Sequence, residues 1–378
     1  MKIMKISKTN NDVKNKKRVV VAMSGGVDSS VAAALMLEKG YEVIGLTMQL
    51  YDGNNQKAQN SKSCCAGQDI YDAKRVAEKL GIDHYVLNYE NRFFQDVIKD
   101  FADTYAEGKT PIPCIRCNEK MKFRDLLSTA LGLEAEMLVT GHYAIIKKNK
   151  SNVSLLRAFD KEKDQSYFLF ATPIELLEKV YFPLGNMSKS STRKYARKFE
   201  LPVSDKPESQ DICFVQSTKK GAYREIVKKL RPDVSRSGEI IHVNGSKMGQ
   251  HDGIDGFTIG QRRGLGVNSN NGEPLYVTKI DPKDRIVYVG EEKDLLVTKF
   301  RSIDITWLTK IEIGSQIVAK VKVRSQHDPQ EAKIFIDDDK KATIIFNSPC
   351  SGVALGQASV FYKGDQVLGG GWISENLN

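Results

Sequence analysis

The chain has 378 residues, of which 40% are hydrophobic and 28% charged, a composition typical of a globular protein with two or three domains. No window approaches the roughly 20 apolar residues of a membrane span, and the N-terminus lacks an apolar core of signal-peptide length. We therefore expect a cytoplasmic protein with reduced thiols and no membrane partner. The formal net charge of +10 favours polyanionic partners such as nucleic acid.

The first half of the chain alternates short apolar runs with amphipathic segments. The expected strands cover 18–23, 41–48, 84–89 and 137–143. The expected helices cover 31–40, 69–81, 92–108 and 117–133. This βαβα alternation predicts an α/β fold with a doubly wound parallel sheet.

From about residue 215 the sequence becomes rich in glycine and turn residues, and short runs of alternating apolar and polar residues follow. Such runs between turn signals predict a small antiparallel β-barrel at the C-terminus. We place the boundaries near 215 and 288, which divides the chain into a disordered tail over 1–16 and segments over 17–214, 215–287 and 288–378.

A glycine loop, SGGVDS over 24–29, directly follows the first expected strand. Open α/β sheets bind ligands at this edge. Gly25 and Gly26 let the backbone approach a ligand closely, and the amides that open the next helix favour phosphate. The loop lacks the G-K-[ST] of a Walker A motif and is not G-x-G-x-x-G. Taken alone, it is also compatible with a structural turn.

The stretch TPIPCIRCNEKMKF over 110–123 contains a C-x-x-C pair, Cys114 and Cys117. Such a pair is found in zinc sites, redox disulfides and iron–sulfur clamps. No second C-x-x-C or histidine pair completes a zinc site. The chain has six cysteines, too few and too unevenly spread for a disulfide scaffold: Cys64, Cys65, Cys114, Cys117, Cys213 and Cys350.

The glycine loop resembles the pyrophosphate loop of the ATP-pyrophosphatase (PP-loop) superfamily, whose members adenylate a substrate oxygen. Further stretches resemble the MnmA family of tRNA-specific 2-thiouridylases in their order along the chain: AMSGGVDSS, TPIPCIRCNEKMKF, TGHYA, KDQSYFL, SQDICFV, GFTIGQRRGLGV and SPCSGVALGQASVFY. The resemblance implies a PP-loop domain, a central tRNA-binding domain and a C-terminal barrel.

The resemblance also implies an activity. The family uses ATP and Mg²⁺ to adenylate the 2-oxygen of the wobble uridine in tRNAs of the lysine, glutamate and glutamine type. Sulfur then replaces that oxygen. A cysteine desulfurase or sulfur-relay protein is the implied sulfur donor.

Site residues carry over by position. Cys213 matches the persulfide cysteine, and Cys117 matches the cysteine that resolves it. The implied ATP contacts are Ala22, Met23, Ser24, Gly25, Gly26, Val27, Asp28, Ser29, Met48 and Gly141. The implied contacts to the target base are Ile112, Pro113 and Cys114. The implied tRNA contacts are His142, Lys163, Asp164, Gln165, Arg324, Ser325 and Gln357.

Cys114 departs from the family pattern, which resembles T-P-N-P-D-x-x-C-N and has an aspartate at this position. A thiolate could replace that carboxylate as a base. Alternatively, Cys114, Cys117 and Cys213 could hold a [4Fe–4S] cluster with one open iron, which would carry the sulfur. Two other function classes stay open, namely another PP-loop adenylating synthetase and a non-catalytic RNA-binding protein.

Overall fold

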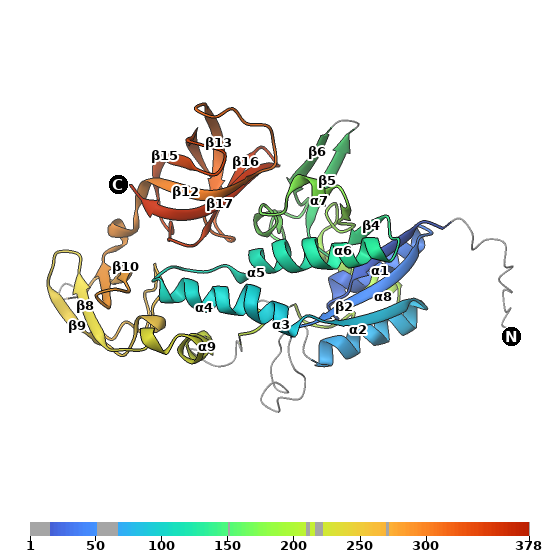
Figure 1. The fold of residues 1–378 in the computed structure, drawn as a ribbon, viewed down its shortest axis with the longest axis horizontal. Helices are drawn as coiled ribbons and strands as arrows, with labels where there is room; N and C mark the ends of the chain where they lie inside the picture. Colours follow the sequence, from blue (N-terminus) through green and yellow to red (C-terminus); the bar gives the residue numbers. More distant parts are fainter. Residues whose placement is uncertain are drawn as a thin grey trace, which may run out of the picture.

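The computed structural model describes residues 16–50, 67–149, 152–208, 212–215, 222–269 and 272–377 (Figure 1). Most of the tail expected over 1–16 lies outside the described residues, as do Cys64 and Cys65. No helix among the described residues is long and apolar enough to cross a membrane.

The N-terminal part is built on a five-stranded sheet in the order β3-β2-β1-β4-β7, with every pairing parallel. Its strands are β1 (Arg18–Ala22), β2 (Glu42–Gln49), β3 (Asp83–Asn88), β4 (Met137–Val139) and β7 (Val180–Tyr181). Along β1, Val20 packs into one core cluster while Val19 and Val21 pack into another. Successive side chains of a strand point to opposite faces, so the sheet is covered on both faces and the doubly wound prediction is confirmed.

One face of the sheet is covered by α1 (Val27–Glu38), α2 (Gly67–Leu80) and α8 (Lys189–Lys198), whose apolar residues share a single core cluster. The other face is covered by two long helical rods, which extend from the sheet toward the rest of the molecule (Figure 1). The first rod joins α3 (Glu90–Phe93), the π-helical η2 (Phe94–Ile98) and α4 (Lys99–Ala106).

The second rod joins α5 (Pro113–Arg116), the π-helical η3 (Cys117–Leu126) and α6 (Leu127–Gly132). It therefore begins four residues before the helix predicted from residue 117. Proline is tolerated in the first turn of a helix, where its missing N–H has no helical acceptor, and Pro113 stands there. As a result, Cys114 lies on the first helical turn and not in a loop.

The central part contains α9 (Ala222–Leu230) and a four-stranded sheet in the order β10-β11-β8-β9. The strands are β8 (Gly238–His242), β9 (Lys247–His251), β10 (Tyr276–Asp281) and β11 (Ile286–Gly290). The boundary expected near 288 falls within β11, which pairs with both β10 and β8, so the central sheet ends a few residues later, at Gly290. The short alternating pattern of apolar and polar residues in β11 resembles that of the barrel strands that follow, so the sequence alone does not separate the two parts there. The core of this part includes Phe101 and Ala106 of α4, so it packs on the first helical rod.

The C-terminal part is an antiparallel barrel, as predicted. Its strands are β12 (Val297–Trp307), β13 (Gln316–Lys322), β14 (Gln330–Ile336), β15 (Ala342–Cys350), β16 (Ala358–Lys363) and β17 (Gln366–Asn376). The order β12-β15-β14-β13-β16-β17 closes on itself through a β12–β17 pairing.

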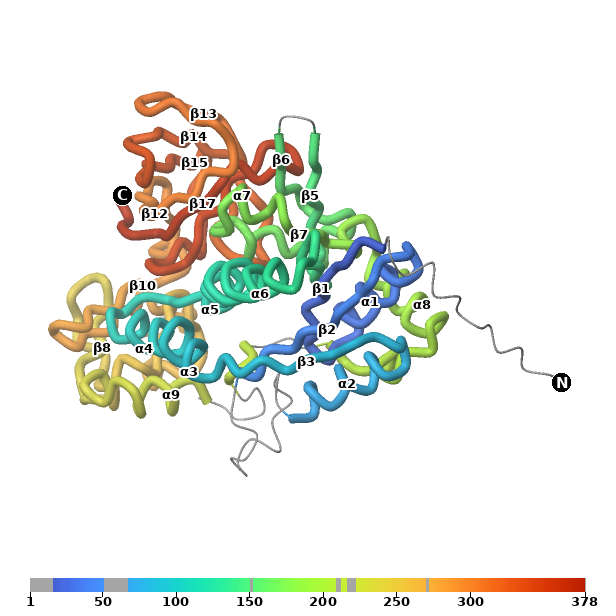
Figure 2. Tube along the Cα trace, turned by 45° about the vertical axis from the view of Figure 1, so that its right-hand side comes forward, coloured from blue at the N-terminus to red at the C-terminus, as the bar shows by residue number. Residues whose placement is uncertain are grey.

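A hairpin from the N-terminal part joins this barrel, which the sequence did not indicate. Its strands, β5 (Ala144–Asn149) and β6 (Asn152–Arg157), reach the barrel through a pairing of Leu156 with Gln366 of β17 (Figure 2). The remaining short helices are η4 (Ser166–Phe168), α7 (Ile174–Leu177), η5 (Pro232–Val234), η6 (Ile254–Gly256) and η7 (Glu292–Leu295).

Candidate active site

A cavity of about 410 Å³ lies between the loop after β1 and the helical rod that carries Cys114 and Cys117. Cys213 also lines this cavity. Most of the site residues expected from the sequence share its wall: Ala22, Met23, Ser24, Gly26, Val27, Asp28, Ser29, Met48, Pro113, Gly141, His142, Lys163 and Gln165. The fold therefore brings the glycine loop and three cysteines to one cavity.

The glycine loop requires glycine because its backbone is crowded. Gly25 has a φ of +70°, and a Cβ added there would lie 2.1 Å from the carbonyl oxygen of Asp69. Gly141, in the segment after β4, is similarly crowded, because a Cβ added there would lie 2.7 Å from the backbone nitrogen of Ser29. Gly25 thus packs against the start of α2 and is not among the residues that line the cavity. Gly141 lets the segment after β4 approach the first turn of α1.

Asp28 lies in the first turn of α1 and orients a cation beside the loop. Both of its carboxylate oxygens accept hydrogen bonds from Lys189 Nζ at 2.7 Å. The hydroxyl of Tyr143 donates to the same carboxylate at 3.0 Å. Burial, reinforced by the charge of Asp28, raises the pKa of Tyr143 far above its ordinary value, so the phenol keeps its proton. The carboxylate at this position is therefore explained by the ammonium group that it holds beside the glycine loop.

Lys206 approaches the loop from the other side. Its Nζ donates to the carbonyl of Gly25 at 3.1 Å and pairs with Asp69 at 2.6 Å and Asp72 at 2.5 Å. Burial opposes the charge of Lys206, but the hydrogen bonds to the two carboxylates outweigh it and raise the pKa of the ammonium. Both Lys189 and Lys206 line the cavity, and neither was singled out from the sequence. For Lys189, the usable signal was its position at the start of a helix that follows a strand of the parallel sheet.

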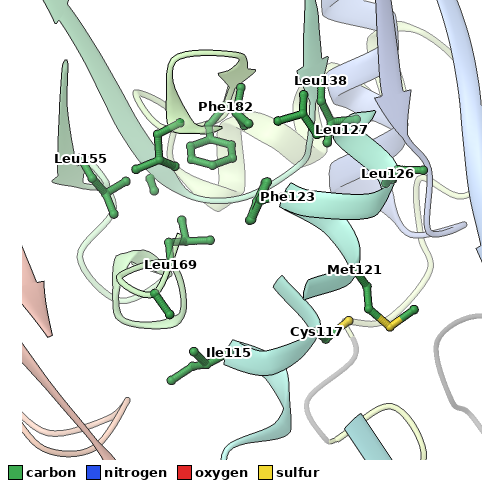
Figure 3. Packing of buried hydrophobic residues seen from close by; sticks show 14 of the residues in the cluster. Ile115, Cys117, Met121, Phe123, Leu126, Leu127, Leu138, Leu155, Leu169 and Phe182 are labelled. Atoms are coloured by element: carbon green, nitrogen blue, oxygen red, sulfur yellow. The ribbon is translucent and has the colours of Figure 1, made fainter. Parts of the chain in front are cut away.

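The cysteines occupy two elements. Cys114 and Cys117 stand three positions apart on one rod, a spacing that places them on the same face of a helix. Cys114 is exposed, whereas Cys117 is 8% exposed. In Figure 3, Ile115 and Phe123 leave the rod on the side of Leu169 and Phe182, whereas Cys117 leaves it on the other side. The apolar side chains therefore anchor the rod while Cys117 is directed to the cavity.

Cys213 lies on the short described segment 212–215 and is partly buried. The next residue, Phe214, makes edge-to-face contacts with Phe93 and Phe101, at ring-centroid distances of 5.9 and 5.1 Å. These aromatic contacts hold the Cys213 segment against the first helical rod.

A preformed metal centre does not fit these residues. Within the described ranges, no group of three or more His, Cys, Asp or Glu side chains is arranged to hold a metal ion. The three cysteines share a cavity wall without forming a ready ligand set, so we derive no step through a [4Fe–4S] cluster.

The KDQ segment contributes two residues to the cavity and one to the interior. Asp164 was expected to contact tRNA, but its side chain is fully buried. It accepts hydrogen bonds from Arg157 Nε at 3.1 Å and from the amides of Ala158 and Ser166. The Asp164 carboxylate therefore holds this turn together and is not exposed to solvent, and the expected tRNA contact of this residue stays a prediction.

His142 is bonded through Nδ1 to the hydroxyl of Thr140 at 2.7 Å. Burial, with the nearby charge of Lys122, lowers the pKa of His142 well below its ordinary value. The imidazole is therefore neutral at physiological pH and does not supply a charge for phosphate.

The remaining expected residues lie at junctions outside the cavity wall. Arg324 of the barrel donates to the carbonyls of Gly352 at 2.9 Å and Ile259 at 3.1 Å. Gln357 donates to the carbonyl of Thr110 at 3.3 Å. Two further expected residues are partly buried: Ile112, which packs against the core cluster beneath the second rod, and Ser325, which follows Arg324 in the chain. Arg324 thus ties the barrel to the central part, and Gln357 ties it to the segment that leads to Cys114.

Comparisons with known proteins find matches to each of the three parts of the chain. Three family models match, described as "tRNA methyl transferase HUP domain" over 17–217, "tRNA methyl transferase PRC-barrel domain" over 225–291 and "Aminomethyltransferase beta-barrel domain" over 297–373. Proteins named tRNA-specific 2-thiouridylase MnmA from Rickettsia massiliae and Rickettsia felis are each 52% identical over 360 residues, which cover 95% of this chain and 97% of the relative.

Solved structures are much more distant. An NMN synthetase from Francisella tularensis is 20% identical, with a TM-score of 0.33, and the match covers 58% of this chain and 79% of that one. A 4-thiouridine synthetase–RNA complex with bound ATP is 15% identical, with a TM-score of 0.34, and the match covers 57% of this chain and 51% of that one. These two likenesses carry no weight for function. From the full-length relatives and the matched models, the chain belongs to the MnmA family of tRNA-specific 2-thiouridylases.

Proposed function

We propose that the chain is a tRNA-uridine 2-sulfurtransferase, which adenylates the 2-oxygen of the wobble uridine with ATP and then replaces that oxygen with sulfur. The observation that carries the proposal is the single cavity lined by the glycine loop and by Cys114, Cys117 and Cys213. Adenylation and sulfur transfer act on the same carbon of the base, so both sets of groups must reach one point.

The nucleotide would lie with its phosphates on the glycine loop. The amides at the start of α1 favour anionic oxygens, and Lys189 and Lys206 place two ammonium groups on either side of the loop. Mg²⁺ would arrive with ATP, whose phosphate oxygens supply its main ligands.

In the first step, a lone pair of the uracil 2-oxygen attacks the α-phosphorus of ATP. The bond from that phosphorus to the bridging oxygen breaks, and pyrophosphate leaves with the electron pair. Lys189 and Lys206 would stabilise the negative charge that develops on pyrophosphate. The step converts a poor leaving group, the carbonyl oxygen, into AMP.

In the second step, the terminal sulfur of a Cys213 persulfide attacks carbon 2 of the base. The Cys117 thiolate then attacks the Sγ of Cys213, the bond between the two persulfide sulfurs breaks, and AMP leaves with the old oxygen. The products are 2-thiouridine, AMP and a Cys117–Cys213 disulfide. A thiol reductant must reduce that disulfide, and a cysteine desulfurase or sulfur-relay protein must load Cys213 again.

The macromolecular substrate would be tRNA of the lysine, glutamate or glutamine type, acted on in the cytoplasm. The net charge of +10 suits a polyanion. Lys163 and Gln165 line the same cavity as the cysteines, which supports their proposed role as tRNA contacts.

The test combines two measurements on the purified protein. With ATP, bulk tRNA, and L-cysteine with a cysteine desulfurase to load the Cys213 persulfide, mass spectrometry of digested tRNA should show 2-thiouridine, and ATP–pyrophosphate exchange should depend on tRNA. Exchange that responds to an amino acid but not to tRNA would instead indicate another adenylating synthetase. Absence of any exchange would indicate a non-catalytic RNA-binding protein.

A further inference from the structure

Asn118 follows Cys117 on η3 and has an unusual environment for a buried amide. The residue is 3% exposed and lines the cavity. Its Nδ2 donates to the carbonyl of Phe168 at 3.1 Å, but its Oδ1 is buried and accepts from no donor among the described residues. Buried side-chain oxygens are nearly always hydrogen-bonded, and leaving one unsatisfied is destabilising.

The orientation of this amide follows from its one hydrogen bond. The Phe168 carbonyl needs a donor, and only the nitrogen of an asparagine side chain can supply one. Exchanging the two amide atoms would place two acceptors against each other. Nδ2 therefore faces Phe168, and Oδ1 remains as an acceptor for something else.

We propose that Asn118 Oδ1 accepts the N3–H of the target uracil and so selects uridine. The inference rests on the proposed function. Enzymes that modify a base take it out of the helical stack and read its Watson–Crick edge by hydrogen bonds. On that edge, N3–H is the single donor of uracil, whereas cytosine presents an acceptor at N3. N3 is also bonded directly to carbon 2, the reacting atom, which matches the position of Asn118 next to Cys117.

The same hydrogen bond would assist the first chemical step. When the 2-oxygen attacks phosphorus, electron density moves from the ring nitrogens toward that oxygen, and N3–H becomes more positive. Its hydrogen bond to Oδ1 is then stronger in the transition state than in the bound substrate, the condition for an interaction that increases rate.

The chain offers a matched control in Thr172. This residue is 1% exposed, and its Oγ1 also has no hydrogen-bond partner among the described residues, yet it does not line the cavity. Thr172→Val and Asn118→Leu both replace a buried polar group by an apolar one of similar size, but only Asn118→Leu should affect base selection.

The test measures binding of full-length tRNA, in the presence of a non-hydrolysable ATP analogue. One tRNA carries uridine at the wobble position and the other carries 3-deazauridine, in which a C–H replaces N3–H at nearly the same size. The unchanged protein should bind the uridine tRNA about tenfold more tightly, the value of one good hydrogen bond. Asn118→Leu should bind both equally, and Thr172→Val should keep the preference.

Equal binding of the two tRNAs by the unchanged protein would overturn the inference, and so would a preference that survives Asn118→Leu. If Asn118→Leu does not fold, binding of the two tRNAs by the unchanged protein still tests whether N3–H is recognised. Formation of 2-thiouridine is measured in parallel. A preference for uridine without 2-thiouridine would refute the proposed reaction and leave the base contact standing.

Discussion

At the scale of single residues, the candidate site depends on charges that hold each other in place. Asp28 holds the ammonium group of Lys189, and Asp69 with Asp72 holds that of Lys206. Ammonium groups held in this way need little reorganisation when charge develops on a leaving group, which is where preorganised electrostatics contribute most.

Lys189→Met is accordingly expected to lower tRNA-dependent ATP–pyrophosphate exchange about 100-fold, because it removes a preorganised cation from beside the glycine loop. Lys198→Met is the control, since Lys198 lies on the same helix, is exposed and pairs only at the surface with Glu38. Equal effects of the two substitutions, or none from Lys189→Met, would contradict this role.

Cys114 gives a second prediction at this scale. If its thiolate acts as a base, Cys114→Ala should lower formation of 2-thiouridine about 100-fold, and Cys114→Asp should restore most of it. If it is instead a cluster ligand, Cys114→Asp should be inactive, and anaerobically purified unchanged protein should contain iron and acid-labile sulfide that Cys114→Ala lacks. Assays of thiolation and of iron, made on the same preparations, separate the two results.

At the scale of elements, the predicted strands and helices were those whose local pattern is strong. The valine-rich β1 and the glycine loop after it are readable because buried parallel strands and phosphate loops each have a local signature. Elements defined by distant partners were not readable. The β5–β6 hairpin is fixed by a pairing with β17, and β11 is fixed by its neighbours in the central sheet.

The same reason explains which site residues were missed. Lys206 and Asn118 acquire their roles from Asp69, Asp72 and the Phe168 carbonyl, none of which is adjacent in sequence. Conversely, Asp164 was assigned to tRNA because its neighbours match a contact stretch, although its own partners bury it. Local sequence identifies the segment that lines a site but not which side chain points into it.

The Cys213 segment offers a prediction at this scale, because Phe214 anchors it against Phe93 and Phe101. Phe214→Ala is expected to slow sulfur transfer about tenfold, since a misplaced reacting group reduces rate steeply, while ATP–pyrophosphate exchange stays unchanged. Phe159→Ala, at a phenylalanine that is 68% exposed, is the control. Equal losses of exchange and thiolation in Phe214→Ala would show a general folding defect instead.

At the scale of the whole molecule, the barrel is docked on the segment that leads to the cysteines. The amide of Thr110 donates to the carbonyl of Leu355 at 2.8 Å, and the guanidinium of Arg116, between Cys114 and Cys117, lies 4.3 Å from the ring centroid of Trp372. The barrel thus directly supports the first turn of the second helical rod, which carries Cys114 and Cys117.

Arg116→Lys tests this support, because lysine keeps the charge but loses the planar group that stacks on Trp372. Hydrogen exchange of residues 110–117 should become faster, while the strands of the barrel stay protected. Arg301→Lys changes a partly exposed barrel arginine that pairs with Glu375 and should leave this segment unaffected. Unchanged exchange over 110–117 in Arg116→Lys would show that the barrel does not hold it.

The central claim is that one cavity performs adenylation and sulfur transfer with separable groups, and Cys213→Ala tests it most directly. The variant should keep tRNA-dependent ATP–pyrophosphate exchange at the level of the unchanged protein and form no 2-thiouridine, whereas Cys350→Ala, at a buried cysteine of the barrel, should keep both. Formation of 2-thiouridine by Cys213→Ala, or loss of exchange together with thiolation in a folded Cys213→Ala protein, would contradict the account.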